Sequence, residues 1–264
     1  MIVISKGRTA EIYRLDGKKV LKLFYQDFPL SEVELEYENN LQIQSTGLKI
    51  PEAFELYKIN GRYGIVYEKI SGNSMLMEMF SNTEKISEYM RILAEVHSEI
   101  HKNTVDKLTS HDERLKRDIY ESPVLSVPEK DRLLMKLKEA THKGNLCHGD
   151  FHPDNVIISE EGPVVIDWIT AAKGNPVADI ARTVILIAVS EPVDNFGNTE
   201  IKEDLRKFLC REYVNGYEKI CPFPRDDLFF WIPIVAGARL NENVPRNEKI
   251  KLYNLAIGGE KLEL

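Results

Sequence analysis

The stretch HGDFHPDNVIISEEGPVVIDW, residues 148–168, decides how this 264-residue chain is interpreted. Asp150 stands five residues before Asn155, and Asp167 follows an apolar, β-branched run after a Gly-Pro turn signal. A hairpin of two short apolar strands would bring Asn155 and Asp167 together, because both stand at its open end. The stretch therefore predicts a carboxylate on a loop, followed by two oxygen ligands that lie side by side.

Such a set of side chains suits the transfer of a phosphoryl group. The reaction needs a carboxylate that accepts or orients the acceptor hydroxyl, and hard oxygen ligands that hold Mg²⁺ against the phosphates of a nucleotide. The interval between Asp150 and Asn155 equals the one between the base and the metal-binding amide in the catalytic loop of protein kinases. Asp150 is thus the candidate catalytic residue, and Asn155 and Asp167 are the candidate metal ligands.

Two motifs resemble those of a known family. HGDFHPDNV, residues 148–156, is similar to the HGDxxxxN loop of the aminoglycoside phosphotransferase and choline kinase family, in which Ile-Asp-Trp replaces the DFG of protein kinases. NPVADIA, residues 175–181, looks like the family's Gly-Asp-Pro-x-x-Asp-Leu-Ala segment. With the N-terminal features described below, the likeness covers residues 1 to about 190, and the remainder is similar only in being helical.

The resemblance implies a fold and an activity. The fold would be α+β and bilobal, like that of protein kinases, with a small β-rich N-lobe over residues 1–70 and a larger helical C-lobe over residues 71–264 that carries the catalytic loop and the acceptor pocket. The activity would be transfer of the γ-phosphoryl group of ATP or GTP, with Mg²⁺, to a hydroxyl of a small molecule. Within the C-lobe, His148 would hold the catalytic loop through hydrogen bonds to its backbone, and Asp179 would brace the same loop.

A metal-dependent hydrolase is an alternative for the same stretch. His148, Asp150, His152 and Asp154 alternate, so they would share one face of a strand. Pro153 breaks a strand at this point, however, and the order lacks the His-x-His-x-Asp-His pattern of metallo-β-lactamases. The downstream carboxylate at position 167 also finds a role only in a phosphotransferase.

A second histidine pair occurs upstream, in HSEIH at residues 97–101. It differs from the zinc-protease motif HExxH, because Glu99 lies two positions from either histidine and projects away from the face that His97 and His101 share. We expect this pair to be a packing or polar feature of a helix that supports the catalytic loop.

The first seventy residues have the element order of a kinase N-lobe. Strand signals and the hairpin turns Asp16-Gly17 and Asn60-Gly61 predict three strands, one helix and two strands. Ser31 is a possible N-cap of the helix, with Glu34 three residues further on. The expected ranges are Met1–Ser5, Ala10–Leu15, Lys19–Phe24, the helix Ser31–Ser45, Glu52–Tyr57 and Tyr63–Glu68.

Lys22 lies in the third of these strands, where the resembled family places the lysine that pairs with the α- and β-phosphates. Its partner should be a helix glutamate, and the glutamates at positions 32, 34, 36 and 38 compete. We favour Glu36, because its distances to Gly47 and Pro51 match those of the helix glutamate in several kinases of this type, and Glu38 comes second.

The loop between the first two strands carries one glycine where protein kinases have three. A phosphate cradle there would depend on backbone N–H groups around Gly7, on the hydroxyls of Ser5 and Thr9, and on Arg8.

The segment Tyr67-Glu68-Lys69-Ile70 resembles the hinge between kinase lobes. Backbone groups of Glu68 and Ile70 would then hydrogen-bond a purine, and Tyr67 would be the gatekeeper.

The rest of the chain is predicted to be helical. The segment from Asp167 to Asp179 is short and lacks the APE signature, so it has no room for an activation segment that docks a polypeptide. A small acceptor is therefore favoured, with an atypical protein kinase or a nucleotide-binding module without turnover as alternatives. The expected helices are Thr83–Asn103, Asp112–Glu121, Pro128–Lys143, Pro176–Ser190, Glu200–Ile220, Arg225–Asn243 and Arg246–Ile257.

Trp168 adjoins Asp167 and is the candidate substrate residue, because an aromatic face attracts a cation. Together with the acidic net charge, it favours an acceptor that carries an amine or quaternary ammonium. Choline, an aminoglycoside, a macrolide, homoserine, a thioribose and a fructosamine would all use the same catalytic apparatus.

The composition bounds the class of protein. A net charge of −7 argues against a nucleic-acid partner, for which clustered Lys and Arg would be expected. The three cysteines have no CxxC spacing, so a reducing cytoplasm fits best. The longest apolar stretch, Leu228–Ala238, is too short for a membrane span, and the N-terminus shows no targeting signal.

Overall fold

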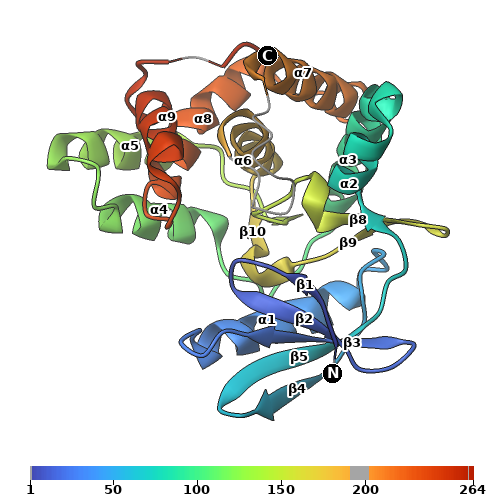
Figure 1. The fold of residues 1–264 in the computed structure, drawn as a ribbon. Helices are drawn as coiled ribbons and strands as arrows, with labels where there is room; N and C mark the ends of the chain where they lie inside the picture. The colour runs from blue at the N-terminus through green and yellow to red at the C-terminus, as the bar shows by residue number, and fades with distance from the viewer. Residues whose placement is uncertain (1, 191–201, 261) are drawn as a thin grey trace. The chain divides into compact units, whose positions relative to one another are not determined.

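The computed structural model describes residues 2–190, 202–260 and 262–264, and it divides into two compact units (Figure 1). The β-rich unit comprises Met1–Ser81 and Pro153–Ala171, and the helical unit comprises Asn82–His152 and Ala172–Leu264. The functional division into residues 1–70 and 71–264 stays a prediction.

The β-rich unit contains a five-stranded antiparallel sheet in the order β1-β2-β3-β5-β4, with α1 between β3 and β4 in the sequence (Figure 1). The order of three strands, one helix and two strands is confirmed. At the turn between β4 and β5, Asn60 and Gly61 both have positive φ, 50° and 79°, as a two-residue hairpin loop requires. The elements are β1 (Ile2–Lys6), β2 (Ala10–Arg14), β3 (Lys19–Phe24), α1 (Leu30–Gln44), β4 (Ala53–Ile59) and β5 (Arg62–Glu68).

The two faces of β3 pack in different clusters. Phe24 lies in one cluster with Val33 of α1 and Ile65 of β5, whereas Leu21 lies in another with Val66. Because side chains alternate along a strand, Lys22 shares the face of Phe24 and points toward α1. The sheet thus places this lysine next to the helix glutamates.

A smaller sheet completes the β-rich unit, in the order β6-β8-β9. The helix α2 in this region was not predicted. Gly72 precedes β6 with a φ of 140°, and a Cβ atom there would lie 2.2 Å from the carbonyl oxygen of Ile158, so only glycine fits. The elements are β6 (Asn73–Ser74), α2 (Met75–Ser81), the 3₁₀ helix η2 (Pro153–Asn155), β8 (Val156–Ser159), β9 (Gly162–Val165) and the 3₁₀ helix η3 (Trp168–Thr170).

The helical unit is built around α6, whose residues are mostly buried and which packs against α7 and α8. Across the parts of the chain that the structure describes, no helix is both long and apolar enough for a membrane span. The elements are η1 (Thr83–Lys85), α3 (Ile86–His101), α4 (His111–Glu121), α5 (Val127–Glu139), β7 (Asn145–Cys147), β10 (Ala172–Gly174), α6 (Pro176–Val189), α7 (Glu203–Ile220), α8 (Arg225–Arg239) and α9 (Arg246–Ile257).

Several predicted helix ends were wrong. The helix expected from Ser31 begins at Leu30 with Pro29 at the N-cap, so Ser31 is not the capping residue. The helix expected to reach residue 143 ends at Glu139, because the next residue is extended. The helix expected to reach residue 243 ends at Arg239. Met1 and Glu200, which began two of the predicted elements, lie outside the described residues.

Candidate active site

Asn155 and Asp167 stand at the open end of the hairpin formed by β8 and β9. Val156 pairs with Val165, and the N–H of Ile166 donates to the carbonyl of Asn155 at 3.0 Å. Asp167 has a left-handed backbone with φ of 66°, which is uncommon outside glycine and is found at functional sites. The Asn155 residue is buried, whereas the Asp167 side chain is 38% exposed. The predicted proximity of the two residues is confirmed.

Lys22 forms a bidentate ion pair with Glu36. Its Nζ lies 2.7 Å and 2.9 Å from the two carboxylate oxygens of Glu36, and 3.0 Å from Oδ1 of Asp167. Burial would lower the pKa of Lys22, but the carboxylates of Asp167 and Glu36 outweigh it and raise this pKa above its ordinary value. Lys22 therefore stays cationic. The predicted pairing with Glu36 is confirmed, and Glu38 is exposed to solvent.

Two further side chains hold this arrangement, and neither contact was predicted. The hydroxyl of Tyr67, the expected gatekeeper, donates to Oε1 of Glu36 at 2.9 Å and is buried. Asn39 of α1 donates from Nδ2 to the carbonyl of Trp168 at 3.1 Å. The first contact ties α1 to β5, and the second ties α1 to the residue that follows Asp167, the carboxylate that Lys22 also contacts.

Trp168 itself is 1% exposed, and its Nε1 donates to the carbonyl of Val165 at 3.2 Å. A ring packed in this way offers no face to an acceptor. Trp168 is therefore a packing residue and not the predicted contact for a cationic acceptor.

The expected nucleotide loop is a tight turn between β1 and β2. The N–H of Gly7 donates to the carbonyl of Ala10 at 2.8 Å, and Tyr25 closes the loop through a hydrogen bond from its hydroxyl to the carbonyl of Gly7 at 3.1 Å. The backbone N–H of Tyr25 also donates, to the carbonyl of Thr9 at 2.9 Å. Ser5 belongs to β1. These bonds shape the loop, while contacts of Ser5, Gly7 and Thr9 with a nucleotide stay predictions.

The expected hinge begins at the end of β5. The N–H of Glu68 donates to the carbonyl of Glu52 at 2.8 Å, so this group is used between strands. The roles of Glu68 and Ile70 in purine binding stay predictions.

In the helical unit, Asp179 of α6 holds the backbone of the loop that carries Asp150. Its carboxylate accepts from the N–H of His148 at 2.6 Å and from that of Gly149 at 2.9 Å. His148 is fully buried, and its Nδ1 accepts from the N–H of Asp150 at 3.2 Å. The expected bracing by His148 and Asp179 is therefore present.

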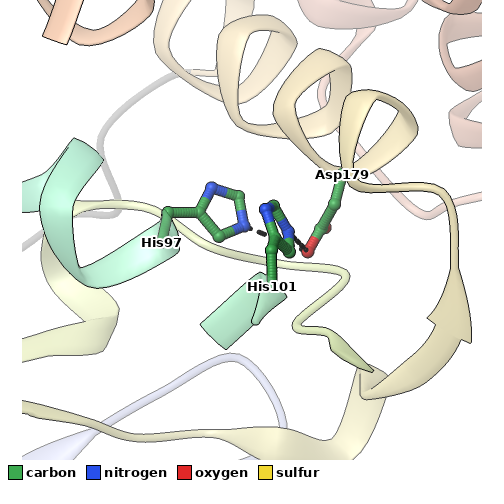
Figure 2. A group of neighbouring side chains, drawn as sticks. All are labelled: His97, His101 and Asp179. Carbon is green, nitrogen blue, oxygen red and sulfur yellow. Dashed lines mark hydrogen bonds and ion pairs between the residues drawn. The ribbon is translucent and has the colours of Figure 1, made fainter. Parts of the chain in front are cut away.

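The histidine pair of α3 supports the same carboxylate (Figure 2). Oδ2 of Asp179 lies 3.0 Å from Nε2 of His97 and 3.2 Å from Nε2 of His101, while the Nδ1 atoms lie 2.6 Å and 2.8 Å from the hydroxyls of Tyr213 and Tyr217. A carboxylate only accepts, so each Nε2 carries a proton and donates it to the hydrogen bond with Asp179. The side chains lie close enough to hold a metal ion, but these hydrogen bonds complete the network without one.

Burial sets the charges of this network. Desolvation lowers the pKa of His97 to about 3, so the ring is neutral at physiological pH. Desolvation would raise the pKa of Asp179, yet the hydrogen bonds from His101 and His97 bring it well below its ordinary value. Hydrogen bonds from the two histidines thus support one ionised carboxylate, which agrees with the expected polar role of the pair.

The carboxylate of Asp150 pairs with Arg182 of α6, a residue that sequence reasoning missed. Oδ1 of Asp150 lies 2.9 Å from Nη2 of Arg182, and Oδ2 lies 3.6 Å from Nε2 of His152. Partial burial would raise the pKa of Asp150, but the contact with His152 and the charge of Arg182 hold it well below its usual value. Asp150 is therefore ionised at neutral pH. The one signal in the sequence was the position of Arg182 three residues after Asp179.

The fold is that of a phosphotransferase with a protein-kinase-like architecture. Residues 1–223 match the model of the phosphotransferase enzyme family, to which the chain therefore belongs. A search of curated protein sequences gave no match.

Solved structures show the same fold. The chain is similar to an aminoglycoside-3'-phosphotransferase of type VIII, with 17% identity and a TM-score of 0.61 over 90% of this chain and 92% of the other. An amicoumacin kinase in complex with AMP-PNP, Ca²⁺ and Ami gives 13% identity and a TM-score of 0.57 over 97% of this chain and 86% of the other. A choline/ethanolamine kinase family protein from Mesorhizobium loti gives 13% identity and a TM-score of 0.58 over 96% and 84%.

Proposed function

We propose that the protein transfers the γ-phosphoryl group of ATP, or of GTP as the alternative donor, to a hydroxyl of a small molecule. One observation carries the proposal: Asn155 and Asp167 meet at the end of one hairpin, and Lys22 bridges Asp167 and Glu36. This set provides two oxygen ligands and one permanent cation. It matches what a nucleotide with a divalent metal requires.

Asn155 and Asp167 would hold Mg²⁺. An amide oxygen and a half-exposed carboxylate are hard donors of the kind that this ion prefers, and the amicoumacin kinase structure contains Ca²⁺ with a nucleotide analogue. When bound, the ion supplies positive charge to the phosphate oxygens. Lys22 supplies a second positive charge, because its pKa is raised, and Glu36, which also accepts from Tyr67, holds its ammonium in place.

Asp150 would act on the acceptor. Its ionised carboxylate accepts a hydrogen bond from the acceptor hydroxyl and orients that oxygen toward the γ-phosphorus. The oxygen forms a bond to phosphorus while the bond to the β,γ-bridging oxygen breaks, and the hydroxyl proton leaves toward Asp150. Because the pKa of Asp150 is depressed, orientation contributes more than proton abstraction.

A small acceptor is favoured by the chain between Asp167 and Asp179. Its residues form η3 and β10 and then enter α6, with Asn175 as the N-cap that accepts from the N–H of Val177. This short segment leaves no activation segment for docking a polypeptide. An atypical protein kinase is therefore the less favoured reading.

The proposed acceptor is an alcohol that carries an amine. The similar structures are named for aminoglycosides, amicoumacin and choline or ethanolamine. The net charge of −7 would raise the local concentration of such a cation and disfavours a nucleic acid. The cytoplasm is the proposed location, because the three cysteines are free thiols.

A screen of hydroxyl-bearing metabolites and antibiotics tests the proposal, with coupled detection of ADP and GDP and mass analysis of the products. We expect Mg²⁺-dependent phosphorylation of at least one amino alcohol by the wild type. Asp150→Asn should lose activity by about 10²-fold or more while it still binds AMP-PNP. Asp131→Asn, at an exposed position of α5, is the matched control and should retain activity.

Three outcomes would contradict parts of the proposal. Preference for neutral or anionic alcohols would contradict the proposal that the acceptor carries an amine, while the kinase assignment would stand. Phosphorylation of polypeptides alone would favour the atypical protein kinase. Nucleotide binding with no turnover of any acceptor or of water would favour a binding module.

A further inference from the structure

One face of α6 holds four consecutive residues of the catalytic loop. Asp179 accepts from the backbone N–H groups of His148 and Gly149, Arg182 donates to the side chain of Asp150, and the hydroxyl of Thr183 donates to the carbonyl of Phe151 at 2.8 Å. Positions i, i+3 and i+4 lie on one face of a helix, which is why these three residues can contact one loop. Of the contacts given for these three residues of α6, the one from Arg182 reaches the candidate catalytic carboxylate itself.

The guanidinium of Arg182 lies between two carboxylates. Its Nη2 donates to Asp150 at 2.9 Å, and its Nη1 donates to Oε1 of Glu242. The Arg182 side chain is 14% exposed, whereas those of Asp150 and Glu242 are 32% and 34% exposed. A guanidinium is planar and its donors are fixed in direction, so the two bonds together set its orientation. Glu242 thus helps to orient the same guanidinium that contacts Asp150.

Glu242 is anchored in turn by a buried ion pair. Its Oε2 lies 3.3 Å from Nε of Arg239, whose Nη2 lies 2.6 Å from Oε1 of Glu248. Arg239 and Glu248 are 1% and 0% exposed and belong to α8 and α9. All three residues lie beyond residue 223, where the match to the family model ends. A continuous series of charge pairs therefore joins the C-terminal helices of this chain to Asp150.

We propose that Arg182 is a positioning residue for Asp150 and that Glu242 acts through Arg182. The inference rests on the proposed phosphotransferase function. Without Arg182, the carboxylates of Asp150 and Glu242 would have no cation between them, and their repulsion would move Asp150 from its place. Without Glu242, Arg182 would keep its charge but lose the contact that fixes its orientation. The first change should therefore harm catalysis more than the second.

The test uses the full chain with Mg-ATP and water as acceptor, and AMP-PNP as the binding probe. The variants are Arg182→Gln, Arg182→Lys, Glu242→Gln and the double variant Arg182→Gln/Glu242→Gln. Arg225→Gln and Glu218→Gln are matched controls, because Arg225 and Glu218 form a bidentate ion pair at 2.8 Å in the same unit without contacting Asp150. Thermal unfolding of each variant reports whether it is folded.

We expect Arg182→Gln to lower kcat by roughly 10- to 100-fold, since a displaced catalytic group costs a factor of this order. The affinity for AMP-PNP should stay within about twofold, because the proposed nucleotide contacts belong to other residues. Arg182→Lys should recover part of the loss, and Glu242→Gln should lose less than Arg182→Gln. The double variant should be no worse than Arg182→Gln, because Glu242 acts through Arg182. The control variants should keep the wild-type kcat.

The inference is overturned if folded Arg182→Gln keeps the wild-type kcat, or if the controls lose as much. If Arg182→Gln does not fold, unchanged kcat in both Arg182→Lys and Glu242→Gln overturns it instead. Additive losses in the double variant would refute the role of Glu242. A wild type that neither hydrolyses ATP nor phosphorylates any acceptor of the screen, or one matched by Asp150→Asn, would contradict the proposed function itself. An active wild type with inactive Asp150→Asn and fully active Arg182→Gln would contradict only the positioning role.

Discussion

Replacement of Asp179 by asparagine should strongly destabilise the helical unit. Asp179 is fully buried, and its carboxylate accepts four hydrogen bonds, from two backbone N–H groups and from His97 and His101. Three of these bonds reach Oδ2, and the N–H of Gly149 reaches Oδ1. An asparagine whose side-chain oxygen occupies the position of Oδ2 must point its NH₂ group at the N–H of Gly149.

The cost follows from these contacts. The NH₂ group of the asparagine would face the N–H of Gly149, so two donors would meet. The three remaining hydrogen bonds would lose the negative charge that strengthens them. Because a hydrogen bond to a charged group contributes about 1.5–3 kcal/mol, we expect a loss of roughly 3–5 kcal/mol in the free energy of unfolding. For a protein of this size, each kcal/mol lowers Tm by about 2–4 °C, so Tm should fall by roughly 6–20 °C.

Thermal and urea unfolding of the wild type and of Asp179→Asn measure this effect. Asp131→Asn, the exposed control, should change stability by no more than about 0.5 kcal/mol. The reasoning would be refuted if Asp179→Asn unfolded within about 2 °C of the wild type, since the network could then not depend on the carboxylate.

Three further predictions concern charge and metal. Asp167→Ala should remove most of the dependence of AMP-PNP affinity on Mg²⁺, because it deletes the anionic ligand; a titration identical to that of the wild type would contradict the metal role. Since the pKa of His97 falls from 6.5 in the unfolded chain to about 3 in the folded one, stability should be full above pH 6.5 and should decrease as the pH drops toward 3, by up to about 1.4 kcal/mol per pH unit. Urea titrations at several pH values give the slope of the free energy of unfolding against pH. In His97→Gln this slope should be smaller than in the wild type by the equivalent of about one proton, and an equal slope would be evidence against the buried neutral ring. Zinc should not raise Tm, because hydrogen bonds satisfy His97, His101 and Asp179, and a concentration-dependent rise would show that an ion displaces them.

The features that could be predicted from the sequence are mostly local. The hairpin that joins Asn155 and Asp167 follows from its turn and its β-branched strands, and the alternation of β3 directs Lys22 toward α1. The preference for Glu36 over its neighbours rested on the resemblance, because its distances to Gly47 and Pro51 match those of the helix glutamate in several kinases of this type. The bracing role of Asp179 came from the family resemblance, and the structure shows the two backbone bonds involved.

The features that were missed depend on packing between distant segments. Arg182 reaches Asp150 across 32 positions, and Glu242 reaches Arg182 across 60. Such contacts require α6 and the end of α8 to be placed in space, which no local pattern specifies. Trp168 illustrates the same limit, because an aromatic residue beside a functional carboxylate can line a site or pack in a core, and here it packs.

Transfer of labelled γ-phosphate tests the central claim most directly. Pools of hydroxyl compounds are incubated with Mg²⁺ and ATP labelled in the γ-phosphate, together with the wild type or Asp150→Asn, and the labelled products are separated. The account predicts that label moves to a small-molecule acceptor with the wild type and that Asp150→Asn lowers this transfer by about 10²-fold or more. Label that stays in ATP and inorganic phosphate for every pool, or equal transfer by the two proteins, would contradict it.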